Sequence, residues 1–311
     1  MKPPSPTGVR HLHRRLGLGL VLLAAVVVLR GASPPRAALA AHARGVLHGI
    51  MESEQSFVRV HAAEALIAAG EADAVRAFFL RELPATEGSA FRIGVWRVLA
   101  TTASSNGERE SWIGKVEQVY CDPAATDRTT ALETLCKLGH RVSGRSLELV
   151  RHESVGAPST PTVLALWSAQ LAGEPNALAA LTGLLTASDP KVRRTAAYAL
   201  RWLHPADPAT RQSLAHAAAV EPAGSNAYAY ILGAALTVDA DPVQAASWEA
   251  ALDQVLATGA TDARFEASWT LRHRYNVANL PPVAKLLDLP ASENDTRVGA
   301  AMIILTTLAR P

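Results

Sequence analysis

The strongest constraint on the fold is a sequence frame that returns at intervals of about 34 residues. The stretches Val58–Leu66 and Val192–Leu200 both read V-R-x-x-A-A-x-A-L. Related frames contain six marker arginines: Arg59, Arg92, Arg128, Arg193, Arg264 and Arg297. Their separations are 33, 36, 65, 71 and 33 residues, and each large gap is close to twice the period. The gaps predict degenerate copies near residues 160 and 228, which gives eight copies.

Each copy is predicted to be a helical hairpin. Val58, Ala62, Ala65 and Leu66 are spaced so that they form one apolar stripe on a helix. The pair Asp189-Pro190 is typical of a helix start, with an acidic N-cap and proline in the first turn. Second apolar segments lie between the marked helices, and no sustained alternation typical of strands occurs. Because one hairpin cannot bury both of its faces, stacking in chain order predicts an all-α, curved solenoid.

The form D-P-x-V-R-x-x-A-A-x-A-L at Asp189–Leu200 resembles HEAT repeats, an armadillo-like family, and most closely the short bacterial kind of phycobilisome-lyase-like proteins. The resemblance covers residues 37–311. It implies a right-handed α-solenoid of about eight hairpins that serves mainly as a binding scaffold. It also implies that the six marker arginines pair with turn acids of a neighbouring repeat and form a structural ladder. A ligand-binding row of arginines is the alternative.

The marked helices are expected to line the concave face of the solenoid. Four tryptophans lie on them and are candidates for binding a partner protein: Trp96, Trp167, Trp202 and Trp269. Their offsets from the marker position differ, so core packing is the competing interpretation. Arg272 and Tyr275 belong to the densest basic-aromatic cluster, Arg272–Tyr275, and are candidates for the same surface. For this cluster, anion binding competes with simple stabilisation of a helix C-terminus.

Residues 1–36 are predicted to be a signal peptide or an N-terminal membrane anchor. They carry six basic residues and no acidic one, and an uninterrupted apolar run extends from Leu16 to Leu29. These fourteen residues fall short of the about 20 that span a bilayer, which favours a secretory signal. Cleavage after Ala38-Leu39-Ala40 and retention of the segment both stay open, as does a buried helix of a cytosolic protein. The expected location is the membrane or the bacterial periplasm.

The remaining composition narrows the function. Taking the six leader residues from 30 basic side chains leaves 24 against 28 acidic ones, so residues 37–311 carry about −4. This mild acidity disfavours nucleic-acid binding. The ten histidines and two cysteines show no metal-ligand spacing, and no catalytic fingerprint occurs, so neither a cofactor nor an enzymatic activity is expected. Cys121 and Cys136 could be bridged or remain buried free thiols.

The expected function is therefore a non-catalytic, extracytoplasmic scaffold that presents a concave helical surface to a partner protein. A structural subunit of a membrane complex or transporter is the first alternative. A lyase-type or glycosylase-type enzyme on a HEAT scaffold is the second. The acidic balance and the exported N-terminus disfavour the glycosylase.

Overall fold

The structure is a computed structural model that describes residues 36–310, apart from 87, 90, 239 and 240. The predicted N-terminal hydrophobic helix, Leu16–Leu29, lies outside the described residues. Within them, the chain forms α-helices and short 3₁₀ helices and contains no strand. The expected all-α class is confirmed for this part of the chain.

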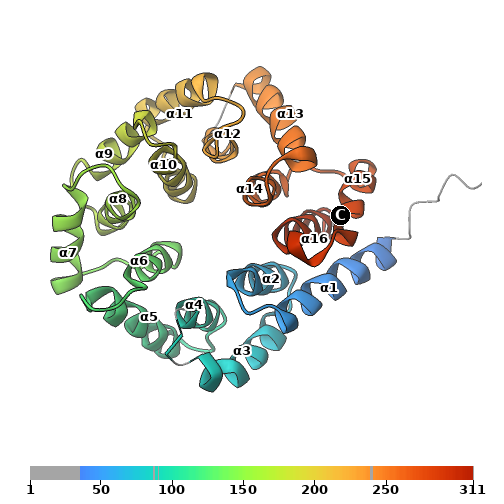
Figure 1. Ribbon diagram of the computed structural model, residues 1–311, viewed down its shortest axis with the longest axis horizontal. Helices are drawn as coiled ribbons and strands as arrows, with labels where there is room; N and C mark the ends of the chain where they lie inside the picture. Colours follow the sequence, from blue (N-terminus) through green and yellow to red (C-terminus); the bar gives the residue numbers. More distant parts are fainter. Residues whose placement is uncertain (1–35, 87, 90, 239–240, 311) are drawn as a thin grey trace, which may run out of the picture. The chain divides into compact units, whose positions relative to one another are not determined.

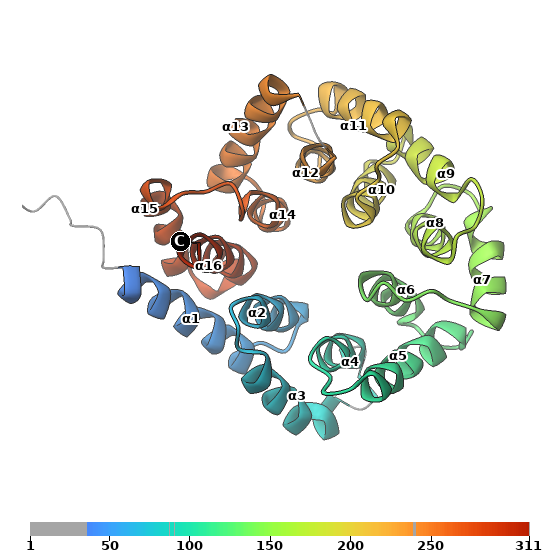
Figure 2. The same ribbon diagram turned by 180° about the vertical axis from the view of Figure 1, so that it is seen from behind.

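The helices of the compact unit 36–311 form two concentric layers (Figures 1 and 2). The outer layer consists of α1 (Arg36–Ser53), α3 (Ala72–Thr86), α5 (Asn106–Cys121), α7 (Gly144–Ser154), α9 (Ala177–Gly183), α11 (Pro208–Val220), α13 (Pro242–Thr258) and α15 (Leu280–Ala284). The inner layer consists of α2 (Phe57–Ala68), α4 (Arg92–Thr101), α6 (Arg128–Lys137), α8 (Thr160–Ala172), α10 (Pro190–Leu203), α12 (Tyr228–Thr237), α14 (Thr261–Leu271) and α16 (Asn294–Leu308). Each outer helix packs against the inner helix that follows it.

The eight described hairpins match the predicted repeats. The six marker arginines lie at or near the starts of inner helices, and the two degenerate copies are α8 and α12. Local signals explain these starts. The side chain of Ser56 accepts a hydrogen bond from the backbone N–H of Val58, and Asp189 caps α10 in the same way ahead of Pro190.

The solenoid closes on itself, which the repeat pattern does not predict. Each inner helix contacts the next one along the chain, and α16 packs against both α1 and α2 (Figure 1). A glycine of α16 also allows a close approach to α14, the inner helix before it. A Cβ atom added to Gly299 of α16 would lie 2.4 Å from Ser268 Oγ of α14. The concave face expected to bind a partner is therefore the inside of a ring.

The marker arginines form a ladder of contacts between successive repeats. Five of them bind an acidic side chain of the following hairpin: Arg59 with Glu82, Arg92 with Asp127, Arg128 with Glu153, Arg193 with Glu221 and Arg264 with Glu293. Most also donate to carbonyl groups at the end of the preceding outer helix, as Arg128 Nε does to Tyr120 O at 2.8 Å. These carbonyls would otherwise lack partners at a helix end.

The sixth arginine continues the ladder across the closure. Arg297 Nη1 donates to Asn294 Oδ1 at 2.6 Å, and Asn294 Nδ2 donates to Glu54 Oε1 at 2.7 Å. Glu54 follows α1, so it occupies the place in the first hairpin that the acid partners occupy in later ones. Asn294 thus relays the contact from the last repeat to the first, and it is 6% exposed.

Replacing Asn294 with alanine is expected to lower the free energy of unfolding by about 1–3 kcal/mol, because Arg297 and Glu54 each lose a part-buried hydrogen bond. Urea denaturation followed by circular dichroism measures the change. Asn279→Ala, at an exposed position before α15, is the matched control and should change stability by less than about 0.5 kcal/mol. Equal effects of the two substitutions would contradict the relay.

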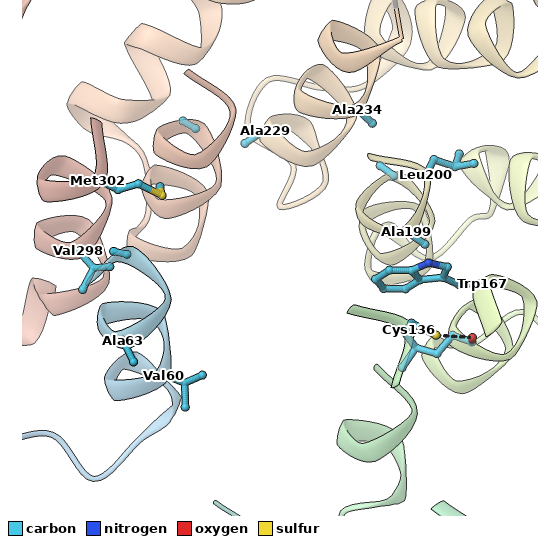
Figure 3. Close-up of a cluster of buried hydrophobic side chains, with 14 of the residues drawn as sticks. Val60, Ala63, Cys136, Trp167, Ala199, Leu200, Ala229, Ala234, Val298 and Met302 are labelled. Carbon is cyan, nitrogen blue, oxygen red and sulfur yellow. Dashed lines mark hydrogen bonds between the residues drawn. The ribbon is translucent and has the colours of Figure 1, made fainter. Parts of the chain in front are cut away.

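Apolar side chains pack between neighbouring helices of the inner layer. In Figure 3 the indole of Trp167 lies in the inner layer, where Ala199 of α10 and Cys136 of α6 come from the two neighbouring helices. Cys121 and Cys136 are free thiols, so the described chain does not contain the bridge that the sequence left open. Among the described helices, none has the length and apolar character needed to cross a membrane.

Candidate binding site at the centre of the ring

The inner helices run in the same direction and give the ring two different mouths. Arg194, near the start of α10, pairs with Asp262 near the start of α14 at 3.2 Å. Trp202, near the end of α10, contacts Trp269 near the end of α14, with ring centroids 5.9 Å apart. We call the end where the inner helices begin the N-terminal mouth, and the opposite end the C-terminal mouth.

The N-terminal mouth opens into a cavity of about 290 Å³. Its lining comes from α2, α6, α8, α10, α12 and α14, with threonines such as Thr129, Thr160 and Thr195 at its edge. Arg194, Tyr230 and Phe265 are half-buried within it. The guanidinium of Arg194 lies 5.5 Å from the centre of the Tyr230 ring. On the other side, the His61 ring stacks on Phe265 at 4.6 Å.

A chain of charged side chains crosses the interior. Glu64 of α2 pairs with Arg97 of α4 at 2.8 Å, and Glu133 pairs with Lys137 one turn later on α6 at 2.9 Å. The hydroxyl of Tyr198 donates to Glu133 at 3.1 Å across α8. These contacts join helices that are up to two repeats apart, so they tie the inner layer together across the ring.

A third ion pair joins α10 to α14. Arg201 Nη2 of α10 donates to Glu266 Oε2 of α14 at 3.1 Å, and both side chains are less than a tenth exposed. The pair spans α12, which contributes Gly233 at this level. A Cβ atom there would lie 3.2 Å from Glu266 Oε1 and 2.6 Å from Thr270 Oγ1. The missing side chain at Gly233 therefore provides the space in which Arg201 of α10 reaches Glu266 of α14.

The three interior carboxyl groups do not titrate alike. Burial raises the pKa of Glu266, and the attraction of Arg201 does not fully offset it. Burial acts in the same direction on Glu133, but Lys137 and Arg97 outweigh it and lower its pKa to about 2. Burial likewise opposes ionisation of Glu64, yet Arg97, Lys137 and His61 hold its pKa below the usual value. Glu266 is therefore the interior acid that is most easily neutralised.

An aromatic cluster forms the partition between the two mouths. The Trp202 ring lies 6.3 Å from Trp167 and 5.9 Å from Trp269, and Tyr198 contacts Trp167 and Tyr230. The guanidinium of Arg201 lies within 5.5 Å of both the Tyr198 and the Trp269 ring centres. Arg201, Trp202 and Trp269 line the cavity of each mouth, so they separate one from the other.

The cavity of the C-terminal mouth has a volume of about 310 Å³ and no acidic side chain in its lining. Its walls are Trp202, Trp269 and Leu236, together with Arg201, Arg272 and other basic groups. Arg272 stacks on Trp269 with its guanidinium 4.4 Å from the ring centre. The two cavities thus differ in charge: one holds both signs and the other only positive groups and histidines.

The structure brings together four of the six candidate partner-binding residues. Trp202, Trp269 and Arg272 surround the central cavities, and Trp167 packs beside them. Trp167 is only 1% exposed, so it packs in the core, as the competing interpretation has it, and is not available as the candidate partner-binding residue. Trp96 lies apart, between α4 and α5, where Arg92 and Lys115 stack on it. Tyr275 follows α14 and donates its hydroxyl hydrogen to Asp253 of α13.

Sequence reasoning missed the charged interior. A signal for it exists: the residue five places after the marker is polar or aromatic in five of the six marked repeats, as Glu64, Arg97, Glu133, Tyr198 and Trp269. Charged residues at a fixed register within an apolar frame indicate a shared polar axis. Arg201 and Glu266 carry no such signature and were not predicted.

Chemically, the arrangement is suited to recognition. Each interior carboxyl group has a basic partner, and aromatic rings surround the pairs, which favours binding through charge and stacking. Within the described residues, no group of three or more His, Cys, Asp or Glu side chains is placed to hold a metal ion. Comparison with known proteins finds no family model that matches this chain and no curated protein that is significantly similar to it.

Proposed function

We propose that this protein is a non-catalytic scaffold that holds a partner protein over the N-terminal mouth of its ring. The observation that carries the proposal is the cavity at this mouth, with half-buried Arg194, Tyr230 and Phe265 inside it. Tyrosine, tryptophan and arginine are the residues that most often dominate protein–protein binding energy. A protruding side chain or loop of the partner would enter between them.

The arginine ladder supports this choice of mouth. The marker arginines join the starts of the inner helices to the ends of the outer ones, which places the ladder at the N-terminal mouth. Ion pairs fix the rim at five of the eight hairpins, so the rim loses little freedom when a partner binds, and such preorganisation favours affinity.

The remaining sequence-based expectations belong to the same proposal. The ring would be a HEAT-like, right-handed solenoid whose ends meet, located outside the cytoplasm and attached to the membrane through residues 1–36. Because α1 begins at Arg36, cleavage after Ala40 would remove its first turn, including Leu39, which is 9% exposed. This disfavours cleavage at that site, and we propose that the segment is retained as an anchor. A structural subunit of a membrane complex remains the alternative function.

The test uses the full chain, purified in mild detergent from its native membranes, with co-purifying proteins identified by mass spectrometry. A partner identified with the unaltered chain should bind Arg194→Glu at least tenfold more weakly, since a hot-spot residue contributes about 2 kcal/mol or more. Arg145→Glu, at an exposed position of outer helix α7, is the matched charge reversal and should bind normally.

Undiminished binding of the partner by Arg194→Glu would contradict the proposed mouth. Cell fractionation separates the two functions: release of the chain into the soluble extracytoplasmic fraction would contradict the structural-subunit alternative.

A further inference from the structure

The cavity of the C-terminal mouth has more positively charged side chains than carboxylates to balance them. Five basic or imidazole side chains line it, namely Arg201, His204, Arg272, His273 and Arg274. Arg274 forms an ion pair with Glu249, and Arg201 forms one with Glu266. Arg272 donates to the backbone carbonyl of Trp269, and its charge has no carboxylate partner among the described residues. The interior therefore holds more positive than negative charge at this mouth.

The pKa values of the neighbouring groups respond to this excess. Burial, together with repulsion from Arg201, lowers the pKa of Arg272 to about 10. Burial also lowers the pKa of His273, and Arg272 and Arg310 add to the effect. Glu266 attracts Arg272 as well as Arg201, and burial raises its own pKa. An anion within the cavity would relieve the repulsion.

Hydrogen-bond donors at the same place lack partners. Arg201 is 5% exposed, yet its Nη1 group has no hydrogen-bond acceptor in the described structure. The buried Trp202 Nε1 and Thr270 Oγ1 atoms also have none. All three residues line the C-terminal cavity. Buried polar groups without partners carry a free-energy cost, and an acceptor oxygen supplied by a ligand would remove it.

From this geometry we infer that the C-terminal mouth binds a small organic carboxylate with an apolar or aromatic body. The carboxylate would accept hydrogen bonds from Arg201 and face the positive charge of Arg272. The body would rest against Trp202, Trp269 and Leu236, which form the apolar walls. A volume of about 310 Å³ lies at the small end of ligand cavities, roughly 300–1,000 Å³, and restricts the ligand to a small molecule. This site opens at the mouth opposite the proposed protein-binding one, and the two cavities share Arg201, Trp202 and Trp269 as a wall.

The experiment is isothermal titration of the full chain in mild detergent with benzoate as the probe. Benzoate should bind saturably with one site per chain. Benzamide, which has the same shape without the charge, and inorganic phosphate, which has charge without an apolar body, should each bind at least tenfold more weakly. Benzamide affinity equal to that of benzoate, or saturable binding of phosphate alone, would overturn the inference.

Variants locate the site. Arg272→Met keeps an apolar stem against Trp269 and should weaken benzoate binding at least tenfold. Arg272→Lys keeps the charge and should retain affinity within about threefold. A loss of binding in both variants would indicate misfolding rather than loss of the charge. Arg145→Met on outer helix α7 is the control. Unchanged binding by Arg272→Met with an intact circular dichroism spectrum, or no saturable binding by the unaltered chain, would also overturn the inference.

Discussion

Arg201→Met is expected to lower the free energy of unfolding by about 3–5 kcal/mol. Removal of one partner of a buried ion pair leaves the other charge uncompensated, and Glu266 is only 2% exposed. The substitution also removes the guanidinium that lies beside Tyr198 and Trp269. Urea denaturation of the two proteins at neutral pH, followed by circular dichroism, measures the difference.

The double variant Arg201→Met/Glu266→Met is the control for this prediction. Replacement of a whole buried pair by apolar residues of similar volume is often close to neutral. The double variant should therefore be more stable than Arg201→Met alone. If the second substitution adds a further loss instead, the two residues are not coupled as an ion pair.

The same variant should show a distinctive pH dependence. In the unaltered protein the pKa of Glu266 is already raised above its ordinary value of 4.5. The folded state therefore binds a proton more tightly than the unfolded state, and stability decreases as pH rises above 4.5 until the folded pKa is passed. Without Arg201 the folded pKa rises further. The loss caused by Arg201→Met should thus be smaller near pH 4.5 than at neutral pH.

Trp167→Ala is expected to cost about 3–5 kcal/mol, because it leaves a large cavity in the inner layer. The side chain is 1% exposed and contacts both Tyr198 and Trp202. Thermal and urea denaturation measure the effect. Trp167→Phe retains an aromatic body and should cost less, whereas Trp96→Ala removes a half-buried ring between α4 and α5 and should also cost less than Trp167→Ala. A fully stable Trp167→Ala protein would contradict the assigned packing role.

The hairpins could be predicted because each depends on local signals. The V-R-x-x-A-A-x-A-L frame gives both the apolar stripe and the small residues, and Asp189-Pro190 marks a helix start without any long-range information. The two unmarked helices α8 and α12 followed from the period alone. Neighbour-to-neighbour stacking then required only that each hairpin be too small to bury both faces.

Closure could not be predicted in this way. The curvature of a solenoid is the sum of small rotations between successive repeats, and the period does not contain their size. The contacts that reveal closure join residues at opposite ends of the chain, such as His61 with Asp295 at 2.9 Å. The Arg201–Glu266 pair could not be predicted from the sequence for a related reason. It depends on which residues of two non-adjacent helices meet across Gly233.

Closure also bears on how such a chain can change in length. An open array accepts one more repeat at either end, since each new copy needs only a single neighbour. In residues 36–310 the first and last hairpins pack against each other, through contacts of α16 with α1 and α2, so neither has a free face for another repeat. A duplicated hairpin would have to widen the circle or break the Asn294 relay. The geometry of the closed ring therefore fixes the number of hairpins, and gain or loss of a single repeat is disfavoured.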